Sequence, residues 1–102
     1  MLDNDVMILE DARDVVFKLE KEYRRAVLAS DLARMAELSP QLDAAGDGLS
    51  QARLNLLKEG QIATDADVAE MRRIKGAIDQ AANDQQLAAG VLQFVGFIAK
   101  FL

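Results

Sequence analysis

The chain has 102 residues, of which about half are apolar, a net charge of −5, and no cysteine, histidine or tryptophan. This composition excludes disulfides, thiolate zinc sites and imidazole general bases, and the negative charge disfavours nucleic acids and anionic lipids, which bind clustered Lys and Arg. We therefore expect one non-enzymatic domain without cofactor or metal, in the reducing cytoplasm.

The N-terminal residues MLDNDVMILEDARD do not resemble a secretory signal, which needs a basic segment followed by an apolar run. The longest apolar segment, 87–102, has sixteen residues and contains Lys100. A transmembrane helix needs about 20 predominantly apolar residues. We therefore expect no membrane span.

The first predicted helix covers residues 4–38, either straight or kinked near residue 30. It begins near Asp3, Asn4 and Asp5, whose side chains suit a helix N-terminus. Its apolar residues recur at the spacing of one helical face. Phe17 and Leu28 fall outside that stripe, so they are either singly exposed residues or part of a second contact face.

The second predicted helix covers residues 40–59. Ser39 is a good N-cap and Pro40 suits the first helical position, where its missing amide does no harm. Gly60 is a typical residue just beyond a helix C-terminus. Gly46 and Gly48 lie inside the segment and predict a bend or a break.

The third predicted helix covers residues 65–102 and begins at a capping box formed by Thr64 and Asp67. Its apolar residues keep one phase across five heptads, which favours a single long helix. The polar run at 83–86 favours the alternative, in which Asn83 ends one helix and Asp84 caps another. The sequence thus predicts an all-α antiparallel bundle of three long helices, or of four if the last one breaks.

We expect a single chain of this kind to be too small to cover its own apolar surface. The second helix is little more than half as long as the other two, so it leaves the C-terminal half of the third uncovered. A break at 83–86 would fold that half back but leave the first half of the first helix uncovered. We therefore expect a homo-oligomer, most simply a two-fold symmetric dimer.

The motifs that carry chemistry are almost absent. No serine has the neighbours of a known nucleophile, and the carboxylate pairs are typical of solvated helix faces, so neither catalysis nor a metal site is predicted. Two groups of basic residues, around Arg24 and Arg72, are interspersed with acids, which argues against nucleic-acid binding.

The C-terminal residues form an amphipathic helix whose apolar arc fills about half of the circumference. This width predicts a scaffold protein that self-associates through the helix or docks onto an unidentified protein. The alternative is a membrane-surface or secreted effector, although the single basic residue on the polar face, Lys100, argues against membrane binding. With Phe17 and Leu28, the predicted interaction residues are Leu87, Val91, Leu92, Phe94, Val95, Phe97, Ile98, Phe101 and Leu102.

Overall fold

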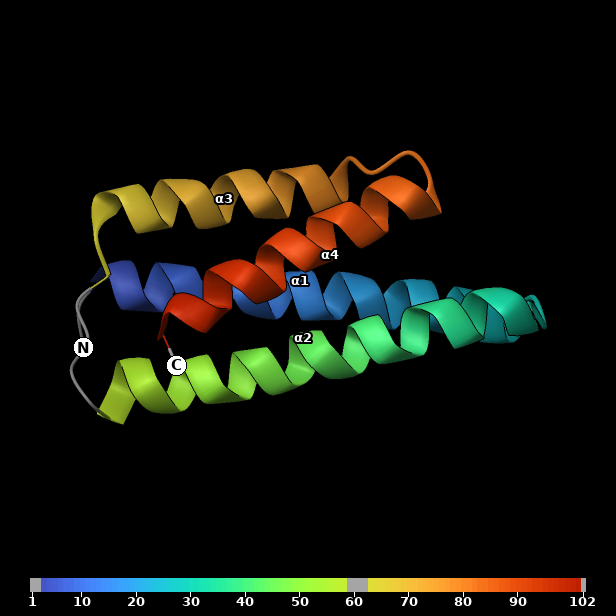
Figure 1. The fold of residues 1–102 in the computed structure, drawn as a ribbon, viewed down its shortest axis with the longest axis horizontal. Coiled ribbons are helices and arrows are strands. Elements are labelled where there is room, and N and C mark those ends of the chain that lie inside the picture. Colours follow the sequence, from blue (N-terminus) through green and yellow to red (C-terminus); the bar gives the residue numbers. More distant parts are fainter. Residues whose placement is uncertain (1–2, 59–62, 102) are drawn as a thin grey trace.

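The computed structural model describes residues 3–58 and 63–101 and shows an all-α bundle (Figure 1). Its elements are α1 (Asp3–Leu28), α2 (Leu32–Lys58), α3 (Asp65–Asp79), α4 (Asp84–Ile98) and the 3-10 turn η1 (Ala99–Phe101). The predicted all-α bundle is therefore confirmed, in its four-helix form. Leu102 lies outside the described residues.

The first helix ends ten residues earlier than predicted, at a tight turn over residues 29–31. Ser30 has a φ of 55°, in the left-handed region, and its amide donates to the carbonyl of Val27. The amide of Asp31 donates to the carbonyl of Ala26, which completes a Schellman motif. The carboxylate of Asp31 then accepts from the amide of Arg34 and caps α2. The predicted helix over 4–38 is thus wrong, because the chain reverses here.

The predicted helix start at Ser39 and Pro40 is also wrong, since Pro40 lies inside α2. A proline in a helix interior costs about 3 kcal/mol because it removes one hydrogen bond and clashes with the preceding turn. Buried Leu38 and the partly buried Leu42 pack into the core on either side of it, and this packing offsets the cost. α2 also continues through Gly46 and Gly48, so neither glycine breaks it.

The predicted capping box at the start of α3 is confirmed. Thr64 accepts from the amide of Asp67, whose carboxylate accepts from the amide of Thr64. α1 begins at Asp3, as the acidic residues there predict, and buried Asp5 also accepts a hydrogen bond from the amide of Ala63 at 3.1 Å. Asn4 donates to the carbonyl of the same residue, so the start of α1 is tied to the start of α3.

The break near residues 83–86 occurs, and the single long helix over 65–102 is wrong. α3 ends at Asp79, and Asn83 caps α4 by accepting from the amide of Gln86. The side chain of Gln86 in turn accepts from the amide of Ala82. These polar residues satisfy the free amides of a new helix start, whereas a continuous helix would leave them unused. The gap is only four residues long, which is why the apolar phase continues across it.

The bundle consists of two antiparallel hairpins, α1–α2 and α3–α4. They pack against each other so that α1 lies beside α3 and α2 lies beside α4. α1 and α3 are parallel, since Asp11 pairs with Arg72 and Asp14 with Lys75. α2 and α4 are also parallel neighbours. Near their C-terminal ends, Asn55 donates a hydrogen bond to the carbonyl of Phe101. α3 therefore covers the first half of α1, which a break at 83–86 was expected to leave uncovered.

One core lies between the two hairpins and includes side chains from every helix. Its largest fully buried side chains come from α1 (Ile8, Val15, Leu19), α2 (Leu38), α3 (Met71, Ile74, Ile78) and α4 (Phe94, Ile98). α3 and α4 approach so closely at Gly90 that a Cβ atom there would lie 2.7 Å from Cγ1 of Ile78. The glycine thus sets how closely the second hairpin packs.

Candidate functional site

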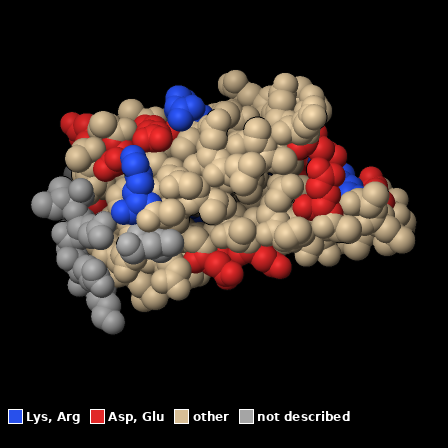
Figure 2. All heavy atoms as spheres, in the orientation of Figure 1, with Lys and Arg blue, Asp and Glu red and all other residues tan. Residues whose placement is uncertain are grey.

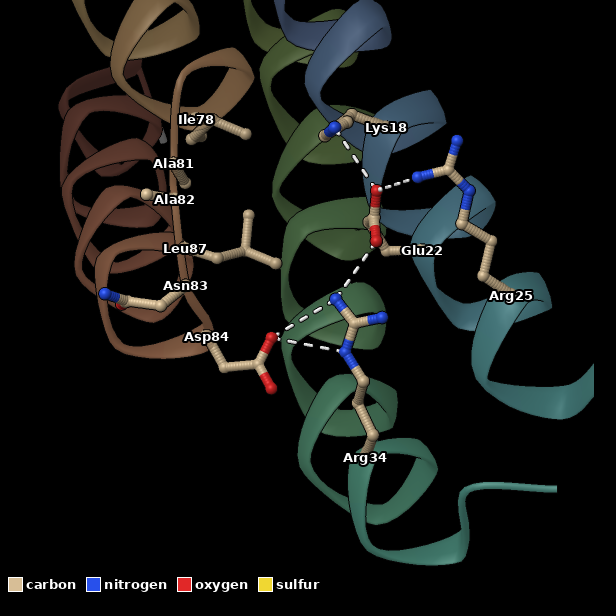
Figure 3. Close-up of a pocket in the computed structure, with 10 residues that line it drawn as sticks. All are labelled: Lys18, Glu22, Arg25, Arg34, Ile78, Ala81, Ala82, Asn83, Asp84 and Leu87. Atoms are coloured by element: carbon tan, nitrogen blue, oxygen red, sulfur yellow. Dashed lines mark hydrogen bonds and ion pairs between the residues drawn. The ribbon is translucent and has the colours of Figure 1, made fainter. Parts of the chain in front are cut away.

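The structure offers two surface features as candidate sites, a charged cavity at the α3–α4 turn and an uncharged groove between α2 and α4. The cavity has a volume of about 300 Å³ and lies where α1, α2 and the start of α4 meet (Figure 3). Ile78, Ala81 and Leu87 form its apolar side, and charged side chains of α1 and α2 form the opposite side.

Glu22 is the centre of the charged side. It is 7% exposed, and its carboxylate accepts from Arg34 at 3.0 Å and lies 3.2 Å from both Lys18 and Arg25. Arg34 also donates to Asp84 at 3.2 Å, so one guanidinium joins α1, α2 and α4.

The pKa of Glu22 reflects these partners. Burial raises the pKa of its carboxyl, but the hydrogen bonds from Lys18 and Arg34, with the charges of Lys18 and Arg25, outweigh burial and hold it below the usual value. Each cation lining the cavity already faces a carboxylate, and both carboxylates, Glu22 and Asp84, are held in ion pairs. This arrangement fits a structural clamp better than a catalytic centre.

The structure places most of the predicted interaction residues inside the protein's own core. The buried ones are Leu87, Val91, Phe94, Phe97, Ile98 and Phe101. Phe17, Leu28 and Leu92 are 60%, 86% and 75% exposed, and Val95 is partly buried. Phe17 and Leu28 lie on α1, so the structure does not bring them together with the exposed residues of α4.

Phe97 is covered by its own chain, although the sequence places it beside the polar strip of the last helix. Its ring lies edge-on to that of Phe101, with centroids 5.4 Å apart, and the Nζ of Lys100 lies 5.2 Å from its centre. Lys100 also pairs with Glu70 of α3 at 3.2 Å. Phe97 faces this side because α3 folds back along α4, which a single long helix would not allow.

The outer side of α4 is a surface without charge. Between Asp84 and Lys100 no residue is charged, and Figure 2 shows that charged side chains on this side of the molecule lie around its edges. Leu92 is the most exposed large apolar residue of this helix. We call this surface, formed by the outer side of α4 and the adjoining side of α2, the α2–α4 face.

An apolar groove of about 380 Å³ lies on the α2–α4 face beside Leu92. α2 contributes Pro40, Gln41 and Ala44 to it, and α4 contributes Ala88, Val91, Leu92 and Val95. The Oε1 atom of Gln41 is buried and accepts no hydrogen bond from any residue that the structure describes. A groove of this composition suits an apolar side chain or helix ridge from another molecule.

Sequence reasoning found Leu92 and Val95 but missed the α2 wall of the groove. Pro40 predicts a helix start at this point, and Gln41 and Ala44 give no signal of their own. The charged cavity was missed as well, because Glu22 and Asp84 are far apart in the sequence and meet only through Arg34. The polar start of α4 at residues 83–86 was the one available indication that this helix is separate.

No family model, curated protein sequence or solved structure matches the chain. Across residues 3–58 and 63–101, no helix combines the length and hydropathy needed to cross a bilayer. Within the same residues, no three Asp or Glu side chains gather in a way that would hold a metal ion.

Proposed function

We propose that this chain is a non-catalytic interaction module that binds a helical protein surface through its α2–α4 face. The observation that carries the proposal is the exposure of Leu92, at 75%, beside a groove whose lining residues carry no charge. Contiguous exposed apolar surface is typical of binding sites rather than of inert surface. Self-association, which the sequence predicts, stays a prediction and would use this face rather than the buried residues of α4.

The chemistry of the face favours a helix as the occupant. Leu92 forms a ridge and the groove beside it is lined by small or flat side chains, including Ala44 and Ala88. A ridge that enters such a groove is the usual contact between two packed helices. A polar or charged ligand would find few partners here, since Gln41 is the one polar residue lining the groove.

Membrane insertion of the C-terminal helix, the alternative from the sequence, has little support. Its large apolar residues, Phe94 and Ile98 among them, pack inside the bundle. Inserting α4 into a bilayer would remove those side chains from the core and unfold the second hairpin. The exposed remainder of α4 has one large apolar side chain, which is too little for an interfacial helix.

A photo-reactive amino acid incorporated at Leu92 tests the proposal in the native host. Irradiation is expected to yield a covalent protein adduct from this position, because a bound partner would contact it directly. Phe17 is the matched control, since it is apolar, is 60% exposed and lies on α1. No adduct from Leu92, or the same adducts from both positions, would refute the interaction module.

A further inference from the structure

We propose that the occupant of the α2–α4 face is an amphipathic helix with a basic edge, whose apolar side chains contact Leu92 and the groove and whose Lys or Arg side chains lie over α2. The inference rests on the proposed function, because it states the chemistry of the partner of the same face. Two observations carry it. The groove is apolar, and the charged side chains of α2 beside it are all acidic.

The middle of α2 carries negative charge alone. Residues 35–52 contain three charged side chains, all of them acidic and exposed: Glu37, Asp43 and Asp47. None of them forms an ion pair with a residue that the structure describes. Figure 2 shows acidic side chains along the edge of the molecule where α2 lies in Figure 1. This edge can therefore pair with cations from another molecule.

Two of these acids lie on the groove side of α2. Glu37 precedes Gln41 by four residues, and Asp47 follows Ala44 by three. Gln41 and Ala44 line the groove, and residues three or four apart are neighbours on a helix surface. Glu37 and Asp47 therefore stand at the two ends of the groove wall that α2 forms.

α2 and α4 keep one register over the length of the groove. Arg34 pairs with Asp84 near the start of both helices, and a Cβ atom on Gly48 would lie 3.4 Å from Cγ2 of Ile98 further along. In both contacts the α4 residue is numbered fifty higher than its neighbour on α2. Because the two helices are parallel, the same offset places Leu92 level with the middle of the groove wall that α2 forms.

This register places one acid on either side of Leu92. Glu37 and Asp47 are ten residues apart, or about 15 Å along α2, and Leu92 is level with the midpoint between them. A partner helix that lies along the groove therefore meets apolar side chains in the middle and a carboxylate near each end. Its two cations would be about eleven residues apart, which is close to three turns and thus on one side of the helix.

The acids of α2 do little for the stability of the chain itself. Asp43 and Asp47 are four residues apart, and like charges at this spacing repel each other on a helix surface. Aspartate is also among the poorer helix formers, and Gly46 and Gly48 weaken the same stretch of α2. A cation from a partner would relieve the repulsion, so a basic helix should stabilise the middle of α2.

The opposite side of α4 is a poorer site for the same partner. A second groove lies between α3 and α4, and three glutamines line it beside Ala77: Gln80, Gln86 and Gln93. Exposed Arg73 lies one turn before Ala77 on α3 and would repel a cation placed there. A helix that is both apolar and basic therefore fits the α2–α4 groove better than the α3–α4 groove.

The overall charge of the chain favours the same partner. With a net charge of −5, the chain attracts a cationic segment before contact, over a distance of about 10 Å at an ionic strength of about 0.1 M. Salt weakens an association of this kind, whereas it leaves contacts between apolar side chains in place. Salt dependence thus distinguishes a basic helix from an uncharged one.

Fluorescence anisotropy with two synthetic peptides and the purified full chain tests this chemistry. Both peptides are stapled amphipathic helices of about five turns with the same Leu and Ala stripe; one carries two lysines beside the stripe, about eleven residues apart, and the other carries glutamates there. The lysine peptide is expected to bind at least about tenfold more tightly than the glutamate peptide, and more weakly as NaCl is added. Equal affinities, or binding of neither peptide, would overturn the basic partner.

Matched variants of the chain locate the binding site. Glu37→Gln with Asp47→Asn should weaken binding of the lysine peptide about three- to tenfold, since each exposed ion pair contributes little. Glu10→Gln with Asp79→Asn is the control, because it removes the same charges from exposed positions on α1 and α3. Equal losses in the two variants would show attraction to the net charge alone and would exclude a site on α2.

Sequencing of the partner segment that is photo-crosslinked to Leu92 separates this inference from the proposed function. A segment with Lys or Arg beside an apolar helical stripe supports the basic helix. An adduct with an acidic or uncharged segment, or with a second copy of this chain, would overturn the basic helix and leave the interaction module intact. The absence of any adduct would refute the module and this inference with it.

Discussion

Replacement of Gly90 by alanine should destabilise the fold, although alanine is the better helix former. The added Cβ would lie 2.7 Å from Cγ1 of Ile78, well inside the 3.5–4.0 Å at which two carbon atoms attract each other. Ile78 is fully buried and its Cα lies 3.8 Å from the same Cβ. The side chain therefore has little room to move away, and α3 and α4 must separate.

The expected magnitude follows from two opposing effects. Alanine in place of glycine in a helix interior stabilises by about 1 kcal/mol. Overpacking a filled core costs about 1–3 kcal/mol. We therefore expect a net loss of about 1 kcal/mol, which lowers the melting temperature of a domain of this size by roughly 4–8 °C.

Gly46→Ala is the matched control, because a Cβ at Gly46 in α2 would meet no atom within 4 Å. This variant should gain about 1 kcal/mol, so the two substitutions should have opposite signs in urea and thermal unfolding. Trimming the neighbour in the double variant Gly90→Ala with Ile78→Val should recover part of the loss, as a double-mutant cycle would show. If Gly90→Ala stabilises as much as Gly46→Ala, the close approach of α3 and α4 is refuted.

Three further perturbations test other parts of the structure. Ser30→Gly should raise the free energy of unfolding by about 1 kcal/mol, because glycine adopts the left-handed φ of 55° without strain; a decrease in urea unfolding would contradict the turn. The pKa of the Glu22 carboxyl is lowered from 4.5 in the folded state, so its contribution is present above that pH and is lost as the pH falls through the folded pKa. Glu22→Gln should therefore cost about 2 kcal/mol at neutral pH and flatten the acid limb of a stability-against-pH curve, and an unchanged limb would exclude this role. Phe94→Ala should cost about 3–5 kcal/mol whereas Leu92→Ala should change monomer stability by less than about 0.5 kcal/mol, and equal losses in calorimetry would show that α4 is oriented differently.

The parts of the fold that depend on local chemistry could be predicted from the sequence. Thr64 and Asp67 form their capping box between neighbouring residues, so their pattern was sufficient to place the start of α3. At Ser30 the sequence indicated a kink at most and not a reversal of the chain, because a serine in the left-handed region has no signature like that of glycine. The predicted helix start at Pro40 was wrong for the opposite reason. Proline has a strong local preference for a helix start, and the packing of α2 overrides that preference.

The candidate face depended on tertiary structure, so only part of it was predictable. The amphipathic pattern of α4 separates its two sides but does not show which of them the chain itself covers. Phe94 and Leu92 are both large and apolar and lie two residues apart, yet one is buried and the other is 75% exposed. The difference arises because α3 folds back onto one side of α4, and that path depends on the four residues between the helices.

The parallel packing of α1 with α3 and of α2 with α4 is the arrangement of consecutive helix pairs in an α-solenoid. In such proteins the terminal pair needs a polar outer face, and a pair without one behaves as an internal layer. In the α3–α4 pair, α4 is of this second kind, since it has no charged side chain from Gln85 to Ala99. In these terms a designed helix pair fused beyond η1 should add the next layer of the stack.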